Sequence, residues 1–135
     1  MRIVLDTNVL VSGLLSSSGP PGEILRLLES APIVPCLNER ILVEYREVLA
    51  RPRLVLPVSA VANLLLLLES VGEFIPLGPF AVSLPDPDDE VFLEVAAAAH
   101  ADFLVTGNLR DFPARLRQGI AVVSPREFVD TLHRR

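Results

Sequence analysis

The chain has 135 residues and half of them are hydrophobic, which is typical of one folded domain with its own core and excludes an intrinsically disordered protein. Its formal net charge of −5 argues against a protein that holds nucleic acid over its whole surface, although it permits a local cationic groove. All 12 basic residues are arginine, so every mechanism that needs a lysine is excluded.

Several features favour a cytoplasmic protein without a membrane contact. The single cysteine, Cys36, cannot form an intrachain disulfide, which fits a reducing compartment. Met1 and Arg2 lead directly into an apolar stretch and an aspartate, so we expect no signal peptide. The run Leu64 to Leu68 is bounded by Asn63 and Glu69 and is far shorter than the ~20 residues of a membrane span.

The predicted elements alternate between strands and helices. In chain order we expect a strand at 2–5, a surface loop at 16–22, a helix at 22–30, a strand at 33–37, a helix from 39 to about 50, a leucine-rich helix from 59 to about 71, a strand at 74–77, a helix at 86–101, strands at 103–105 and 120–123, and a terminal helix from 125. Asn38 and Ser124 are the expected N-caps, whereas Pro35 weakens the second strand. Such alternation predicts an α/β fold whose parallel sheet is covered on both faces.

The stretch "IVLDTNVL", residues 3–10, sets an aspartate directly after an apolar run. One interpretation is a short buried strand that delivers the carboxylate of Asp6 to its C-terminal end, where ligands bind in open α/β sheets. The other is a structural cap, with Asp6 as the N-cap of a helix that starts at Thr7.

Three further segments carry oxygen-bearing side chains. Glu44 lies about 100° from the centre of the apolar face of its helix, on the border of the buried side, and an ordinary solvated glutamate is the alternative. "DPDDE", residues 86–90, opens a helix, but its four acids exceed what a cap needs. "FLVTGNLRDF", residues 103–112, again ends an apolar strand in small and polar residues, with Asp111 one turn further on.

Acids and amides from four separate segments are the ligands that hard divalent cations prefer. The sequence contains no zinc-ligand spacing, no G-x-S-x-G, no phosphate-binding lysine loop and no G-x-G-x-x-G. We therefore expect a Mg²⁺ or Mn²⁺ site that activates water against a phosphodiester.

The chain resembles a PIN domain, and in particular the toxins of VapC-like toxin–antitoxin modules. The resemblance is carried by "VLDTNVLVSGLLSSSGPPGEIL", "SAPIVPCLNERILVEYREVLARP", "DPDDEVFLEVAAAAHADFLVTGN" and "VVSPREFVD" in this order, and it spans nearly the whole chain as one domain, 1–135. It implies a Rossmann-like three-layer α/β/α fold with a mainly parallel central sheet. It also implies a metal-dependent endoribonuclease that dimerises and is silenced by a cognate antitoxin.

Carried over residue by residue, the family's acids fall on Asp6, Glu44 and one member of the 86–89 segment. We choose Asp89, with Asp86 and Asp88 as open alternatives. The fourth family acid is replaced here by Asn108, after Thr106, and Asp111 is the nearest substitute. The expected catalytic residues are Asp6, Glu44 and Asp89, the expected metal ligands are Asp6, Asp89 and Asn108, and the supporting residues are Thr7, Asn8, Asp86, Thr106 and Asp111.

Other functions fit the sequence less well. A haloacid-dehalogenase-like phosphatase needs an acid at position 8, where this chain has Asn8, and both that class and receiver domains need a lysine. A PIN scaffold without activity, which only binds RNA or a protein, is the serious alternative because Asn108 brings no charge. Two arginine groups, Arg46, Arg51 and Arg53, and Arg110, Arg115 and Arg117, flank the expected site and could contact RNA.

Overall fold

The computed structural model describes residues 1–30, 32–78 and 82–134. The strands are β1 (Arg2–Leu5), β2 (Val34–Leu37), β3 (Glu73–Phe74), β4 (Phe103–Val105) and β5 (Val122–Val123). The helices are α1 (Thr7–Leu15), α2 (Pro20–Leu27), α3 (Glu39–Leu49), α4 (Val58–Val71), α5 (Glu90–Ala99) and α6 (Pro125–His133), with short 3-10 helices η1 (Pro52–Leu54), η2 (Pro87–Asp89), η3 (Leu109–Asp111) and η4 (Ala114–Leu116).

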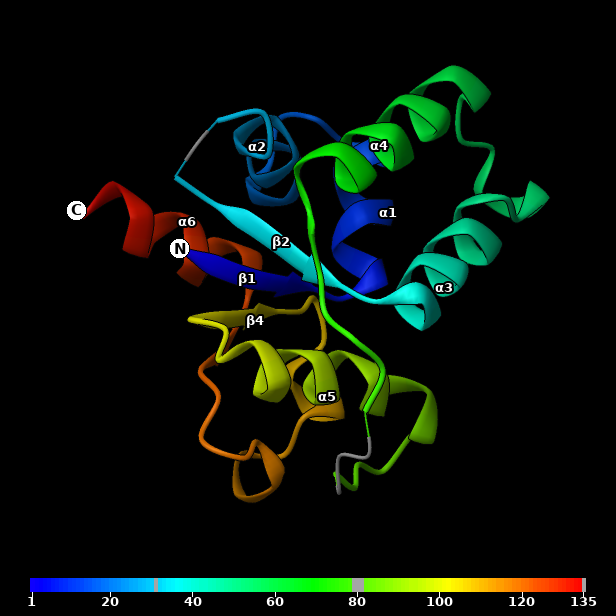
Figure 1. The fold of residues 1–135 in the computed structure, drawn as a ribbon. Coiled ribbons are helices and arrows are strands. Elements are labelled where there is room, and N and C mark those ends of the chain that lie inside the picture. The colour runs from blue at the N-terminus through cyan, green and yellow to red at the C-terminus, as the bar shows by residue number, and fades with distance from the viewer. Residues whose placement is uncertain (31, 79–81, 135) are drawn as a thin grey trace.

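The five strands form one parallel sheet in the order β3-β2-β1-β4-β5, as expected for an α/β fold (Figure 1). β1 lies at the centre of the sheet, and its residues Ile3, Val4 and Leu5 are at most 1% exposed, as expected for a strand that is covered on both faces. It pairs with β2 on one side and with β4 on the other, where Leu5 lies opposite Val105. The carboxyl ends of β1 and β4 therefore lie side by side.

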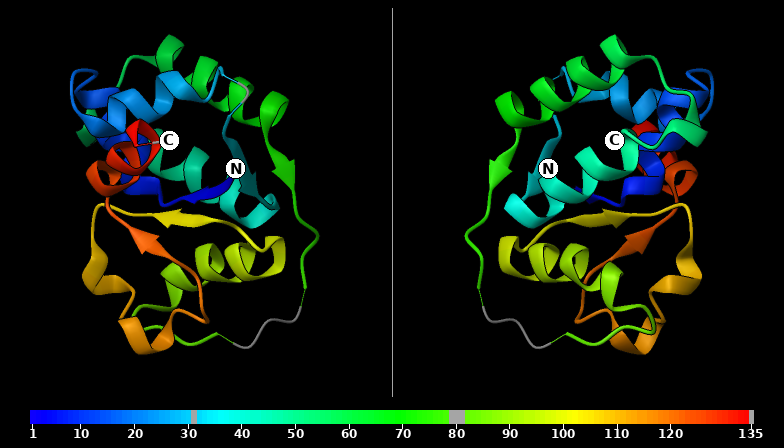
Figure 2. Two further views of the ribbon diagram at one scale, coloured as in Figure 1. Left: turned by 90° about the vertical axis from the view of Figure 1, so that its left-hand side faces the viewer. Right: turned by 90° about the vertical axis from the view of Figure 1, so that its right-hand side faces the viewer.

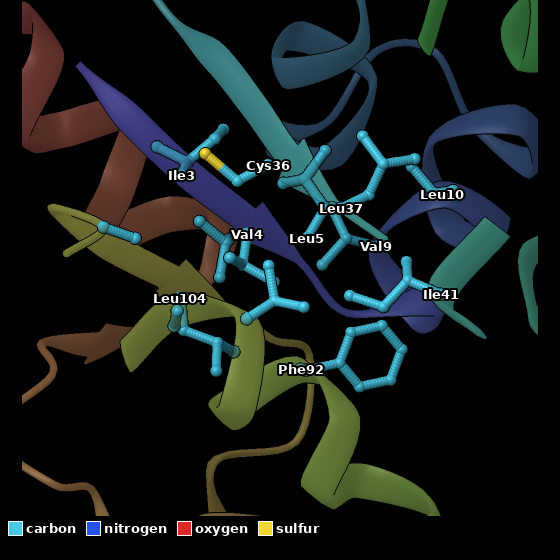
Figure 3. Close-up of a cluster of buried hydrophobic side chains, with 14 of the residues drawn as sticks. Ile3, Val4, Leu5, Val9, Leu10, Cys36, Leu37, Ile41, Phe92 and Leu104 are labelled. Carbon is cyan, nitrogen blue, oxygen red and sulfur yellow. The ribbon is translucent and has the colours of Figure 1, made fainter. Parts of the chain in front are cut away.

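Helices cover the sheet on both faces, which gives three layers (Figures 1 and 2). α5 packs on one face against β1, β2 and β4, while α1, α2, α4 and α6 lie on the opposite side. The core forms around β1, where Leu5 belongs to one buried cluster with Leu37 of β2, Val9 of α1 and Phe92 of α5, and Phe92 lies beside Ile41 (Figure 3). α3 follows β2 and stands at the carboxyl end of the sheet, where it contacts α1 and α5.

Several expected boundaries are wrong in detail. α2 begins at Pro20, so residues 20–22 are helical and not part of the expected loop, since proline suits the first helical turn. The expected strands at 74–77 and 120–123 shorten to β3 and β5. The expected helix 86–101 divides into η2 and α5, and it ends where His100 adopts a left-handed φ of 51°.

Pro35 is compatible with a strand because of its register. The Val34 amide donates to Met1 O at 2.8 Å, so strand alternation turns the nitrogen of Pro35 away from β1. Pairing of β2 with β3 begins only at Cys36, so no hydrogen bond is lost there.

The leucine-rich helix α4 is buried on one side only. Leu68 is fully buried and Leu64 is 6% exposed, whereas Leu66 is 64% exposed and Val58 is 85% exposed. An apolar face of α4 thus stays uncovered by its own domain. No helix within the described ranges is long and apolar enough to cross a membrane.

Candidate active site

The sheet topology brings Asp6 and Thr106 together at one edge. Asp6 follows β1 and Thr106 follows β4, and the Asp6 amide donates to Val105 O at 2.9 Å. The chain crosses from β3 at one edge to β4 beyond β1, so β1 and β4 border the point where the strand order reverses. In open parallel sheets this is the position at which ligands bind.

Asp6 combines both positions that the sequence left open. It ends the buried strand and it also occupies the N-cap position of α1, but its carboxylate makes no cap hydrogen bond. Instead its Oδ2 accepts from Thr106 Oγ1 at 2.9 Å and from Asn8 Nδ2 at 3.3 Å. The side chain is only 5% exposed, and this burial raises its pKa to about 6 against the opposing effect of the Thr106 hydrogen bond.

Asn8 and Thr106 tie the two strand ends to each other. Asn8 Oδ1 accepts from the Gly107 amide at 2.8 Å, while Thr106 Oγ1 accepts from the Asn108 amide at 3.0 Å. A Cβ at Gly107 would lie 3.1 Å from Asn8 Oδ1, so glycine permits this close approach. The orientation of Asp6 is thereby fixed from both of its neighbouring segments.

Asp89 is the acid of the 86–89 segment that faces inward. Its Oδ2 is buried and has no hydrogen-bond partner among the described residues. Burial raises its pKa to about 7, with further contributions from the negative charges of Asp6 and Asp111. Asp86 instead accepts from the Asp88 amide at 2.9 Å and caps η2, and Asp88 is exposed.

Glu44 lies on the border of α3, half-buried, beside the 86–89 segment. Burial raises its pKa, and so does the negative charge of Asp88, whereas Arg51 lowers it. The next residue, Tyr45, lies on the buried face of α3. Its hydroxyl donates to Leu5 O at 2.6 Å and its ring stacks on Phe92, which fastens α3 to the end of β1.

The remaining candidates lie at the rim of this site. Asn108 is exposed, and its described hydrogen bonds are made by its backbone: its amide donates to Thr106 Oγ1 and its carbonyl accepts from the Asp111 amide at 3.1 Å. Asp111 is half-buried and close enough for its charge to raise the pKa of both Asp6 and Asp89. Thr7 is buried, and its Oγ1 finds no partner within the described parts of the chain.

The site fits a cation, although its carboxylates are not closely gathered. No group of three His, Cys, Asp or Glu side chains in residues 1–30, 32–78 and 82–134 stands close enough to hold a metal ion. However, the buried Asp89 Oδ2 lacks a partner, and the charges of Asp6 and Asp111 raise its pKa. An oxygen-preferring divalent cation would supply the missing partner and remove the repulsion.

Comparison with known proteins identifies the family. The model of the PIN domain family matches residues 2–110. The chain belongs to the PIN domain family. It is 31% identical, over 96% of its length and 90% of the relative's, to the uncharacterized protein MJ1680 of Methanocaldococcus jannaschii. This PIN domain also shares its fold with a chain of the crystal structure of VapBC2 from Rickettsia felis bound to a DNA fragment from their promoter. The two chains superpose with a TM-score of 0.59 at 17% sequence identity, and the match covers 92% of this chain and 98% of the other.

The raised pKa values predict that stability of the metal-free protein falls with rising pH. The pKa values of about 6 and about 7 mean that folded Asp6 and Asp89 keep their protons up to about those pH values, whereas unfolded aspartates lose theirs near their ordinary pKa of 3.8. Between these values the folded state binds more protons, so the free energy of unfolding decreases as the pH rises. We expect the free energy of unfolding to decrease on the order of 2 kcal/mol between pH 5 and 8. Most of this decrease should come from Asp6, because Asp89 is less buried and water screens its charge.

Urea unfolding in EDTA measures this decrease, and Asp6→Asn should reduce it. Asp130→Asn, at an exposed position of α6, is the matched control and should leave the slope unchanged. A wild-type stability that rises from pH 5 to 8, or a slope unaffected by Asp6→Asn, would contradict the assigned burial of this carboxylate.

Proposed function

We propose that this PIN domain is a Mg²⁺- or Mn²⁺-dependent endoribonuclease and the toxin component of a toxin–antitoxin pair. The observation that carries the proposal is a pair of raised-pKa carboxyls, Asp6 at the carboxyl end of β1 and Asp89, whose pKa the charge of Asp6 helps to raise. Membership of the PIN family and the fold shared with a chain of the VapBC2 structure support it.

In this proposal Asp6 and Asp89 hold the cation, and the side-chain oxygen of Asn108 completes the set from the rim. A divalent cation held by these residues would supply Lewis acidity, lowering the pKa of a water and stabilising negative charge on a phosphodiester. Thr106 and Asn8 keep Asp6 Oδ2 in place through their hydrogen bonds, so this ligand is already oriented before a cation binds. The half-buried Glu44 accepts a proton from the attacking water, a role that its raised pKa suits.

Arginines beside the site supply the positive charge that RNA requires. Arg51 and Arg53 are exposed at the C-terminal end of α3, and Arg110 and Arg115 are exposed after β4. Arg46 is less available because it pairs with Glu69 at 2.7 Å. These groups offer contacts to phosphates on two sides of the carboxylates and offset the net charge of the chain locally.

A PIN scaffold without catalysis is the second candidate function. It is favoured by Asn108, which brings no negative charge to the position of the fourth family acid. A scaffold of this kind would bind RNA or a partner protein through the same edge without requiring a cation.

Cleavage of total RNA in the presence of Mn²⁺ distinguishes the two functions. We expect cleavage that EDTA abolishes, and a loss of at least about 100-fold in Asp6→Asn, because the variant removes a charged ligand. Asp130→Asn is the control and should retain full activity. Wild-type protein that binds RNA but cuts none across a total-RNA panel would favour the inactive scaffold.

We further propose that the protein forms a homodimer through α4 and that an antitoxin is its physiological partner. The uncovered side of α4, with Leu66 64% exposed and Val58 85% exposed, is apolar surface that a second chain would bury. The structure that shares this fold is VapBC2 bound to a DNA fragment from their promoter, which supports an antitoxin partner for this chain.

Light scattering tests the dimer on the isolated protein. At tens of micromolar we expect the mass of two chains, and Leu66→Glu should give a folded monomer because its side chain points outward. Leu68→Glu, at a fully buried position, should instead unfold the domain. A wild-type monomer at that concentration, or an intact dimer in folded Leu66→Glu, would contradict the proposed interface.

A further inference from the structure

We propose that a pocket between α3 and the start of α5 is a nucleobase subsite that selects guanine. This pocket, the α3–α5 pocket, has a volume of about 300 Å³ and adjoins the carboxylates described above. Glu44 forms one side of it, and Asp88, on another side, directly precedes Asp89. The proposal rests on the proposed function, since the occupant is a base of the RNA that reaches the site.

The walls of the α3–α5 pocket suit a flat aromatic ring. Val43 on α3 and Val91 on α5 contribute aliphatic surface from opposite sides, and Pro87 contributes a third apolar wall. Val91 is only 5% exposed and lies deep, whereas Val43 is 46% exposed and lies at the mouth. Unpaired RNA bases splay out of the strand into protein hollows, and here the valines and the proline take the place of the aromatic side chains on which such bases commonly stack.

The polar groups of the pocket are almost all hydrogen-bond acceptors. Glu47 and Asp88 present carboxylates, and neither takes part in an ion pair among the described residues. Such a lining repels a phosphate group, so the base of a nucleotide and not its phosphate enters. Arg40 is the exception: it lies at the edge, 61% exposed, and is held only by Glu94 at 3.5 Å. It is free to contact the phosphate outside the pocket.

An acceptor lining discriminates among the four bases. Guanine presents two adjacent N–H donors on its Watson–Crick edge, which match the two oxygens of one carboxylate. Adenine and cytosine present a single amino group there, and uracil presents one N–H between two carbonyl oxygens that a carboxylate repels. Guanine is therefore the base that the α3–α5 pocket favours most, and uracil the base it favours least.

Titration with 5′-GMP and 5′-UMP in EDTA tests the subsite independently of cleavage. The two nucleotides carry the same phosphate, so a difference between them reports the base. In two-dimensional ¹H–¹⁵N spectra of the full chain we expect GMP to shift the amides of Val43, Glu47 and Val91. We expect binding of GMP to be roughly tenfold tighter than that of UMP, the size of one carboxylate–base pair.

Glu47→Gln is the decisive variant, because it keeps the shape of the side chain and lies outside the proposed catalytic set. It should reduce the preference for GMP to about twofold or less, whereas Glu39→Gln, on α3 but outside the pocket, should leave it unchanged. Equal shifts by the two nucleotides, shifts confined to the arginines after β4, or an unaltered preference in Glu47→Gln would overturn the subsite.

The result also separates this proposal from the nuclease. Selective GMP binding by a protein that cuts no RNA would support the subsite and contradict the nuclease. RNA cleavage by a protein that shows no preference between the nucleotides would overturn the subsite alone.

Discussion

Burial of the Asp6 carboxylate at the end of β1 is the constraint on which the rest of the site depends. A charged group that is 5% exposed loses most of its contact with water, and two side-chain hydrogen bonds compensate only in part. The surrounding chain is arranged to supply them: β4 must pair with β1 in register, so that Thr106 lies opposite, and Gly107 must lack a Cβ. The fold therefore specifies not only where this carboxylate lies but also which way it points.

The neighbouring acid Asp89 adds to the electrostatic cost of burying Asp6. Asp89 ends η2, directly before α5, and its buried Oδ2 has no partner among the residues described. Burial raises the pKa of Asp6 to about 6, and burial together with the charges of Asp6 and Asp111 raises that of Asp89 to about 7, so both carboxyls titrate well above the usual range. Keeping these carboxyls buried lowers the stability of the folded protein once they ionise. Such a trade between stability and activity is common at functional sites, where perturbed pKa values cluster.

Local sequence patterns predicted the parts of the fold that depend on local chemistry. Asn38 accepts from the Ile41 amide at 2.9 Å, and Ser124 forms a full capping box with Glu127, so both expected helix starts are confirmed. The parallel sheet and its layers are confirmed too, because continuous apolar strands between helices permit few other arrangements. The lengths of β3 and β5 were not predictable, since pairing with a neighbour decides where an edge strand ends.

The site was predictable in its residue types but not in its geometry. Spacing alone could not choose among Asp86, Asp88 and Asp89; the inward position of Asp89 follows from the tertiary packing of α5. The metal roles of Asp6, Asp89 and Asn108, the catalytic role of Glu44 and the supporting role of Asp111 stay predictions. The Tyr45 hydroxyl on Leu5 O was missed because tyrosine on an apolar helix face is equally typical of a core residue. Its position directly after Glu44 was the available signal.

The central claim, that Asp6 and Asp89 together hold a divalent cation, is tested most directly by a crystal structure of the protein soaked in Mn²⁺. An anomalous difference map locates manganese without assumptions about its ligands. The account predicts a peak within about 2.5 Å of a carboxylate oxygen of both Asp6 and Asp89. A map without a peak at the carboxyl end of β1, or with manganese bound only by surface acids such as Glu47 and Asp88, would contradict it.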